Sequence, residues 1–276
     1  MTASSPGRAA GLRALEDAAW FGAPRDGIAL LAGLDPAGDV PERVRWLAGV
    51  CLGATGRYAE ARRWLTPGGE PAGSPAASCL ASHLRQVGRH AEAEPLDQLA
   101  LETANSAEAE ADALVGLVAD AVGRHDLNTA ADRLGYIPTV GRVIDDHSAW
   151  RTQIRVAWIT AEVALCRNEF GTAVRCARLA GRKSHLATAR RHAVKSRLVL
   201  GASLDAAGQR RSAARVLRAT ASAGAALELF PLVAVASTLR AGILEIRAPQ
   251  TAHRERRRAS SAQRMLEDPA TGRTTG

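Results

Sequence analysis

One short pattern recurs along the chain, and it constrains the fold more than any other feature. Its clearest copies are Gly56–Ala61 in LGATGRYAEARRWL and Gly88–Ala93 in LRQVGRHAEAEPLDQLA, each with a glycine five residues before an alanine. Three looser copies follow. The alanines of the five copies, Ala61, Ala93, Ala130, Ala173 and Ala213, are 32, 37, 43 and 40 residues apart. Self-similarity at such a period is typical of a repeat protein.

Each copy predicts two helices joined by a tight turn. Ala, Leu, Arg and Glu fill long windows, and the alternation typical of strands is nearly absent. A glycine or asparagine supplies the left-handed turn, and the alanine marks where two helix backbones come close. One hairpin cannot cover its own apolar stripe, so neighbours must stack. We therefore expect an all-α fold, a right-handed α-solenoid of five antiparallel helix pairs from about Val40 to Thr220, with a further helix from Phe230.

The first copy resembles the tetratricopeptide repeat (TPR). Tyr58 and Glu60 lie within Gly56–Ala61, and Trp46–Gly49 supplies the start of the preceding helix. The resemblance covers roughly 180 residues, and its longer periods resemble those of bacterial signalling and transcription-regulator solenoids. It implies a scaffold or adaptor that binds other proteins in bacterial regulation, with a concave groove lined by the first helix of each pair.

Composition suggests where the folded part begins and ends. Residues 1–10 and 248–276 are small and polar, so we expect a disordered N-terminus and a basic, largely disordered C-terminal tail. Residues 11–247 form the predicted repeat domain. Within it, the Gly/Pro-rich stretch 66–76 is predicted as a flexible loop between the first two units.

Charge divides the chain into two unlike halves. The formal net charge is +8, with 13 basic and 20 acidic residues up to Trp150 but 23 basic and 8 acidic residues after it. In a helix, Arg190 and Arg197 share one face, and Arg191 and Lys195 share another. The same reasoning places Arg211, Arg215 and Arg218 in one row.

Several interpretations of these basic rows stay open. They can form a solvated face, or they can bind an acidic protein, the acidic half of a second copy in a homo-oligomer, or nucleic-acid phosphates. No Phe, Trp or Tyr occurs in residues 182–218, so base stacking is not expected. Nucleic-acid association through this arginine-rich half is the alternative function, and it would depend on salt.

The familiar signatures of catalysis are missing from the sequence. There is no phosphate-binding glycine loop, nucleophile elbow or zinc-binding His-Glu-x-x-His helix. Asp145, Asp146 and His147 are interpreted as a helix N-terminus, and the spacing of the four cysteines does not match a structural zinc site. We therefore expect no enzyme activity, cofactor or metal. Without a membrane-spanning run or a secretion signal, a cytoplasmic location is expected.

One group of side chains stands out as a candidate binding patch. Arg155, Trp158 and Glu162 fall on one face of the first helix in the fourth unit. In a TPR-like stack this helix lines the groove, so we predict that the three contact a bound protein or peptide, acidic in character. No asparagine occupies the positions that a chaperone-type carboxylate clamp would need.

Overall fold

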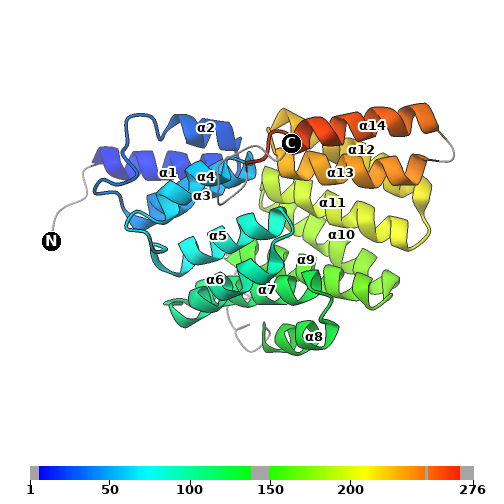
Figure 1. Ribbon diagram of the computed structural model, residues 1–276, viewed down its shortest axis with the longest axis horizontal. Coiled ribbons are helices and arrows are strands. Elements are labelled where there is room, and N and C mark those ends of the chain that lie inside the picture. Colours follow the sequence, from blue (N-terminus) through cyan, green and yellow to red (C-terminus); the bar gives the residue numbers. More distant parts are fainter. Residues whose placement is uncertain (1–5, 138–148, 246–247, 268–276) are drawn as a thin grey trace.

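The structure is a computed structural model, and it describes residues 6–137, 149–245 and 248–267. The regular elements in these ranges are α-helices (Figure 1). They are α1 (Pro6–Trp20), α2 (Pro24–Ala29), α3 (Glu42–Ala54), α4 (Tyr58–Leu65), α5 (Gly73–Gln86), α6 (His90–Glu102), α7 (Ala107–Gly123), α8 (Leu127–Tyr136), α9 (Trp150–Cys166), α10 (Phe170–Leu186), α11 (Arg190–Ala206), α12 (Arg210–Ala226), α13 (Phe230–Leu244) and α14 (Pro249–Gln263). None of them is long and apolar enough to cross a membrane.

Consecutive helices pack in pairs, and the pairs stack into an α-solenoid (Figure 1). The odd-numbered helices from α3 to α13 also contact one another in order, so they form an inner layer, while α4, α6, α8, α10, α12 and α14 lie outside it. The five repeat alanines all lie on outer helices and are fully buried. The predicted all-α stack of antiparallel pairs is thereby confirmed.

The second half of the chain follows a strict rhythm of twenty residues per helix. Helices α9 to α12 each have 17 residues. The turn after each contains one residue in the left-handed region, at Asn168, Thr188, Gly208 and Glu228, with φ of 59°, 52°, 76° and 58°. The next residue donates its N–H to the carbonyl five positions earlier, as from Glu169 to Ala164 at 2.8 Å. This bond satisfies a carbonyl that the helix end leaves free.

The two ends of the solenoid meet, so the stack closes into a ring. Helix α1 contacts α11, and Arg25 forms an ion pair of 3.1 Å with Glu228. At the other end, the Glu267 N–H donates to the Gly56 carbonyl at 3.0 Å, and the Glu267 carboxylate accepts the Ala59 N–H at 3.1 Å. These contacts hold the chain's C-terminal part against the α3–α4 turn (Figure 1).

The structure differs from the predicted boundaries in three places. Helix α1 begins at Pro6, inside the predicted disordered residues 1–10, and α5 begins at Gly73, inside the predicted loop 66–76. Most of the predicted disordered tail 248–276 that is described forms α14. A stripe of alanines (Ala252, Ala259 and Ala262) buries this basic helix against α13, and Glu255 pairs with Arg240. The prediction of disorder rested on the polar and basic composition of this segment and did not take the alanine stripe into account.

Close approach of two helices requires a glycine at Gly201 in α11. A Cβ there would lie 2.6 Å from Cδ2 and 2.7 Å from Cγ of Leu217, which is fully buried. Gly49 faces Leu65 in the same way, with contacts of 2.6 to 2.8 Å. Units at opposite ends of the solenoid therefore use the same glycine–leucine contact to set the spacing of a pair.

We predict that Gly201→Ala destabilises the fold by about 1–3 kcal/mol, because the added methyl overpacks the core. Gly181 in α10 is the matched control, since a Cβ there meets nothing within 4 Å. Gly181→Ala should stabilise by about 0.5–1 kcal/mol through helix propensity alone. Urea unfolding followed by circular dichroism measures both, and equal effects of the two substitutions would contradict this account.

Candidate functional site

The inner helices surround a cavity of about 430 Å³. Its walls come from all six inner helices, α3 to α13, and from His90 at the start of α6. The walls combine apolar and charged side chains. The apolar ones include Val115, Ile159, Leu229, Leu232 and Trp158. The charged ones are Arg85, Arg155, Arg191, Lys195 and Glu162. Four cations and one carboxylate thus line an enclosed space, which gives the cavity a positive character.

A second hollow, of about 780 Å³, lies on the outside between residues 28–37 and α4. It is larger, but most of its lining side chains are exposed, and its Arg57 and Glu60 pair with each other. The central cavity is the better candidate site, because it is more enclosed than the outer hollow and its polar groups converge.

An aromatic cluster closes the cavity on the side of α1. The His192 ring stacks on Trp158 at 5.5 Å and meets Trp150 edge-on at 5.0 Å. Trp20 lies 5.9 Å from His192 and 5.5 Å from Trp46. A small cavity of about 60 Å³, lined by the same tryptophans of α1 and α3, adjoins the main one. The ring contacts join α1, α3, α9 and α11, so the N-terminal helices form the floor of the site.

Trp158 is held rigidly at the cavity wall. Its indole N–H donates to the Ser196 hydroxyl at 2.8 Å, and Ser196 is in turn 2.9 Å from the Ser184 hydroxyl. The Lys195 ammonium lies over the indole at 4.6 Å from the ring centre. Trp158 is 7% exposed, so only a small part of it is accessible from the cavity. A preorganised aromatic wall of this kind contacts a ligand at little entropic cost.

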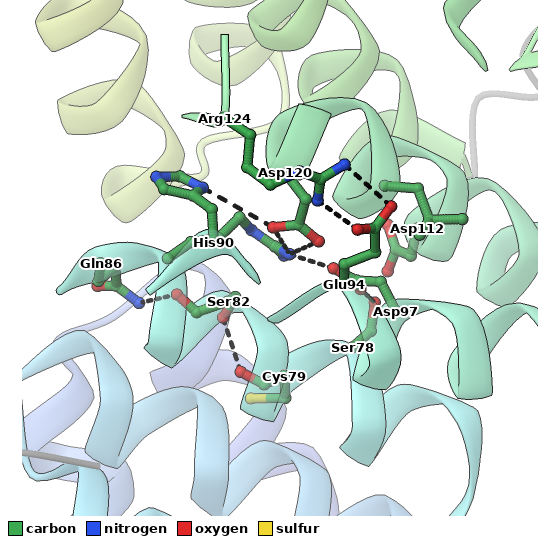
Figure 2. A network of polar contacts seen from close by, with 12 residues as sticks. Ser78, Cys79, Ser82, Gln86, His90, Glu94, Asp97, Asp112, Asp120 and Arg124 are labelled. Atoms are coloured by element: carbon green, nitrogen blue, oxygen red, sulfur yellow. Dashed lines mark hydrogen bonds and ion pairs between the residues drawn. The ribbon is translucent and has the colours of Figure 1, made fainter. Parts of the chain in front are cut away.

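Arg85 is neutralised by carboxylates that lie behind the cavity wall. Its guanidinium donates to Asp97 and to both oxygens of Asp120, at 3.2 and 3.3 Å, and the Ser78 hydroxyl donates to Asp97 at 3.0 Å. Figure 2 shows Asp97, Asp120 and His90 within this network. Burial raises the pKa of Asp97 and of Asp120, although Arg85 opposes the change.

Arg151 and Arg155 of α9 are neutralised from α7. Arg151 pairs with Glu108 at 3.0 Å and with Asp112, and Arg155 pairs with Asp112 at 2.9 Å. Arg151 also lies over Trp46, 5.2 Å from the ring centre. These contacts join the acidic half of the sequence to the basic half within one molecule. One carboxylate, Asp112, therefore serves two guanidinium groups.

Arg191 and Lys195 of α11 differ from the other cations. Among the described residues, neither has an ion pair with a carboxylate, and the Arg191 guanidinium has no hydrogen bond. Burial lowers the pKa of each. For Arg191 the charges of Arg155 and Arg151 lower it further, and for Lys195 those of Arg155, Arg85 and Arg191 outnumber the opposing Glu162. These two cations are therefore partly buried and not directly paired, and Glu162 acts on Lys195 only from a distance.

The structure places the sequence-predicted residues in different surroundings. Arg155, Trp158 and Glu162 all line the central cavity, so the helix face predicted from spacing does face inward. Of the basic rows, Arg191 and Lys195 line the same cavity, which the sequence did not indicate. The remaining members, Arg190, Arg197, Arg211, Arg215 and Arg218, are exposed. Whether any of them contacts a partner stays a prediction.

Sequence reasoning missed part of the exposed basic surface. Helices α10 and α12 contain no Asp or Glu, and both pack on α11. Both helices carry exposed arginines. Arg210 of α12 pairs with Asp205. The others are Arg175, Arg178 and Arg182 on α10 and Arg211, Arg215 and Arg218 on α12; we call these six the outer arginine face. Two pairs, Arg175 with Arg215 and Arg178 with Arg218, lie one 40-residue repeat apart, so the two rows are in register. The 40-residue period was the signal that could have revealed them.

The thiols and the acidic groups offer no obvious chemistry. Burial raises the pKa of Cys51 and of Cys79 to about 12, so both are protonated thiols and poor nucleophiles. Within residues 6–137, 149–245 and 248–267, no group of three His, Cys, Asp or Glu side chains could hold a metal ion. The Asp145–His147 cluster lies outside the described residues.

The fold and the cavity define the class of this chain as an α-helical repeat protein, consistent with TPR-like architecture. Neither a protein-family model nor a curated protein sequence matches it. Among solved structures it is similar to one titled "Crystal Structure of the Apo Form of RapI", at 9% sequence identity and a TM-score of 0.47. The match covers 95% of this chain and 77% of that one. Nothing about function follows from a likeness at this level.

We predict that His83 and His192 stay neutral well below pH 6.5. Burial and the nearby Arg191 charge lower the pKa of His83 to about 3 and that of His192 well below its usual value. The unfolded chain therefore binds protons at these sites as pH falls below about 6.5 while the folded chain does not. As the pH falls below about 6.5, each histidine lowers the unfolding free energy by up to about 1.4 kcal/mol per pH unit. Asp97 and Asp120 have raised pKa values, so their protonation raises the unfolding free energy as the pH falls.

An NMR titration of the imidazole signals from pH 7.5 to 5 tests this prediction directly. The signals of His83 and His192, assigned with His83→Gln and His192→Gln variants, should not move. A midpoint near pH 6.5 for either would show that the ring is accessible to protons and that the aromatic floor is open.

Proposed function

We propose that this chain is a non-enzymatic adaptor that binds a segment of another protein, acidic in character, in its central cavity. The observation that carries the proposal is the cavity itself, where apolar walls and four cations converge from six inner helices. Arg155, Trp158 and Glu162 contact the segment in this proposal. A role in bacterial regulation belongs to the same proposal and rests on the TPR resemblance alone. The four free cysteines support a cytoplasmic location.

The wall composition suits a peptide better than a small metabolite or a folded surface. An enclosed cavity excludes a folded domain, whereas an extended segment can insert one or two side chains. The apolar residues Val115, Ile159 and Leu232 favour aliphatic or aromatic anchors, and Arg191 and Lys195 favour an anion beside them. Glu162 supplies an acceptor for a backbone N–H of the segment. The expected ligand is thus a short sequence that alternates apolar and acidic groups.

Selection of random peptides displayed on phage, with the whole chain as bait, tests this function. We expect peptides that carry Asp or Glu next to large apolar residues. Trp158→Ala should weaken their binding, measured by calorimetry, by about tenfold or more, since a buried tryptophan is a typical hot spot. Leu186→Ala is the control, because this exposed side chain on α10 lies outside the cavity. Peptides that bind Trp158→Ala as tightly as Leu186→Ala would show that the binding site lies outside the central cavity.

The outer arginine face supports a second candidate function, association with nucleic acid. The observation in its favour is the register of the two rows, which gives six exposed guanidinium groups on two acid-free helices. Within the described part of the chain, none of these six arginines forms a salt bridge with a carboxylate. Without aromatic side chains in the rows, contact would be to phosphates rather than bases.

Fluorescence anisotropy with a labelled 30-base-pair duplex, titrated at several salt concentrations, tests the second function. If the face binds phosphates, the logarithm of the affinity should fall with the logarithm of salt by about 0.9 per phosphate contacted. The variant Arg211→Glu/Arg215→Glu/Arg218→Glu should then lose most of the affinity. Reversal of the exposed Arg62 and Arg63 on α4 serves as the control. Binding that is absent or insensitive to salt would leave the outer arginine face a solvated surface.

A further inference from the structure

We propose that the cavity holds an oxyanion, a carboxylate or phosphate group of the bound molecule, between Arg191 and Lys195. This inference rests on the proposed function, because it names the chemical group that the central cavity recognises. The sequence placed both residues only in a general basic surface. The structure places them inside the cavity instead.

The geometry of α11 brings the two cations to one place. Arg191 and Lys195 are four residues apart on a continuous helix, so their side chains lie on the same face one turn apart. Both line the cavity, next to the Trp158 wall. Like charges at this spacing repel each other and destabilise the helix slightly. An anion between them would convert that repulsion into attraction.

The carboxylates near this point are already engaged. Asp112 pairs with two arginines of α9, and Asp97 and Asp120 share Arg85. Glu162 lines the cavity but forms no ion pair with Lys195 among the described residues. Glu162 thus acts on Lys195 without pairing with it. Among the described residues no carboxylate pairs with Arg191 or Lys195, whereas Arg85, Arg151 and Arg155 each have one or more. A bound anion supplies the missing partner.

The surroundings also make the anion's binding strong and selective. Burial penalises the charged forms of Arg191 and Lys195, so their field acts in a medium of low polarisability where ion pairing is stronger than in water. A guanidinium donates two parallel N–H groups to a planar or tetrahedral oxyanion, and the ammonium adds a point charge. Ile159 and Leu232 line the same cavity, so we expect the group attached to the oxyanion to be apolar.

Thermal unfolding and tryptophan fluorescence of the whole chain, titrated with defined anions, test the site. The probes are inorganic phosphate and N-acetyl-leucine, with N-acetyl-leucinamide as the uncharged match for the second. We expect phosphate, N-acetyl-leucine or both to raise the melting temperature and to change the tryptophan fluorescence, while the amide does neither. A response to phosphate alone assigns the site to phosphate, and a response to N-acetyl-leucine alone assigns it to a carboxylate. No response to either overturns the proposal.

Substitutions separate an anion site from a structural role. Lys195→Met and Arg191→Met should each weaken anion binding about tenfold to 100-fold, as expected for a charged hydrogen bond. Without anion, both variants should melt at or above the wild-type temperature, because each removes an uncompensated buried charge. Arg85→Met is the control and should melt lower, since it strands Asp97 and Asp120. If the α11 variants melt as low as Arg85→Met, or bind anions as well as the wild type, the proposal is wrong.

The outcomes also distinguish this inference from the proposed function. One outcome is that selected peptides bind in the cavity of Lys195→Met and Arg191→Met as tightly as in the wild type. That result would support the adaptor function and overturn the oxyanion site. If anions bind but the chain selects no peptide, the oxyanion site is supported and the proposal that the cavity binds a protein segment is wrong.

Discussion

Closure of the ring by the N-terminal aromatic side chains is the contact on which the site depends. An open stack of helix pairs offers a groove that solvent fills. Here Trp20 of α1 reaches His192 of α11, and the Arg25–Glu228 pair and the Glu267 hydrogen bonds add to the closure. The groove becomes an enclosed cavity whose floor is aromatic. Each charged group on its wall then interacts in a medium of lower polarity than water.

That enclosure explains how the charges are arranged. A buried guanidinium is tolerated only with a partner, and Arg85, Arg151 and Arg155 have theirs on the side of the wall away from the cavity. Arg191 and Lys195 lack such a partner, and the Arg191 charge adds to burial in lowering the pKa of His83 and of His192. A fold that maximised stability alone would place apolar side chains at these two positions. Their presence is easier to explain by a ligand than by packing.

The sequence predicted the parts of the fold that follow from local pattern. The small residues of the repeat, such as Ala173 and Ala213, marked the close contacts. Spacing placed Arg155, Trp158 and Glu162 on one helix face, which the TPR resemblance assigned to the groove and which lines the cavity. The turns at Thr188 and Glu228 escaped notice because neither residue type signals a left-handed conformation.

The missing part of the site depends on contacts between distant units. Asp97 and Asp120 belong to different helix pairs and meet only at Arg85, and Trp20 meets His192 only because the ring closes. Curvature of the stack sets these contacts, and no local pattern encodes it. The sequence could therefore place residues on helix faces, but it could not show which cations lacked a partner.

The contrast between the acidic and basic halves has an explanation within one molecule. Glu108 and Asp112 come from the acidic half, and they pair with Arg151 and Arg155 from the basic half across neighbouring inner helices. Part of the charge contrast thus serves to join α7 to α9. A homo-oligomer formed by pairing of the two halves would have to use other carboxylates on the surface. Part of the remaining basic excess lies in the cavity cations of α11, part in the outer arginine face, and part in other exposed arginines such as Arg190 and Arg197. The first group is partly buried and the others are exposed, so they offer different surroundings to an anion.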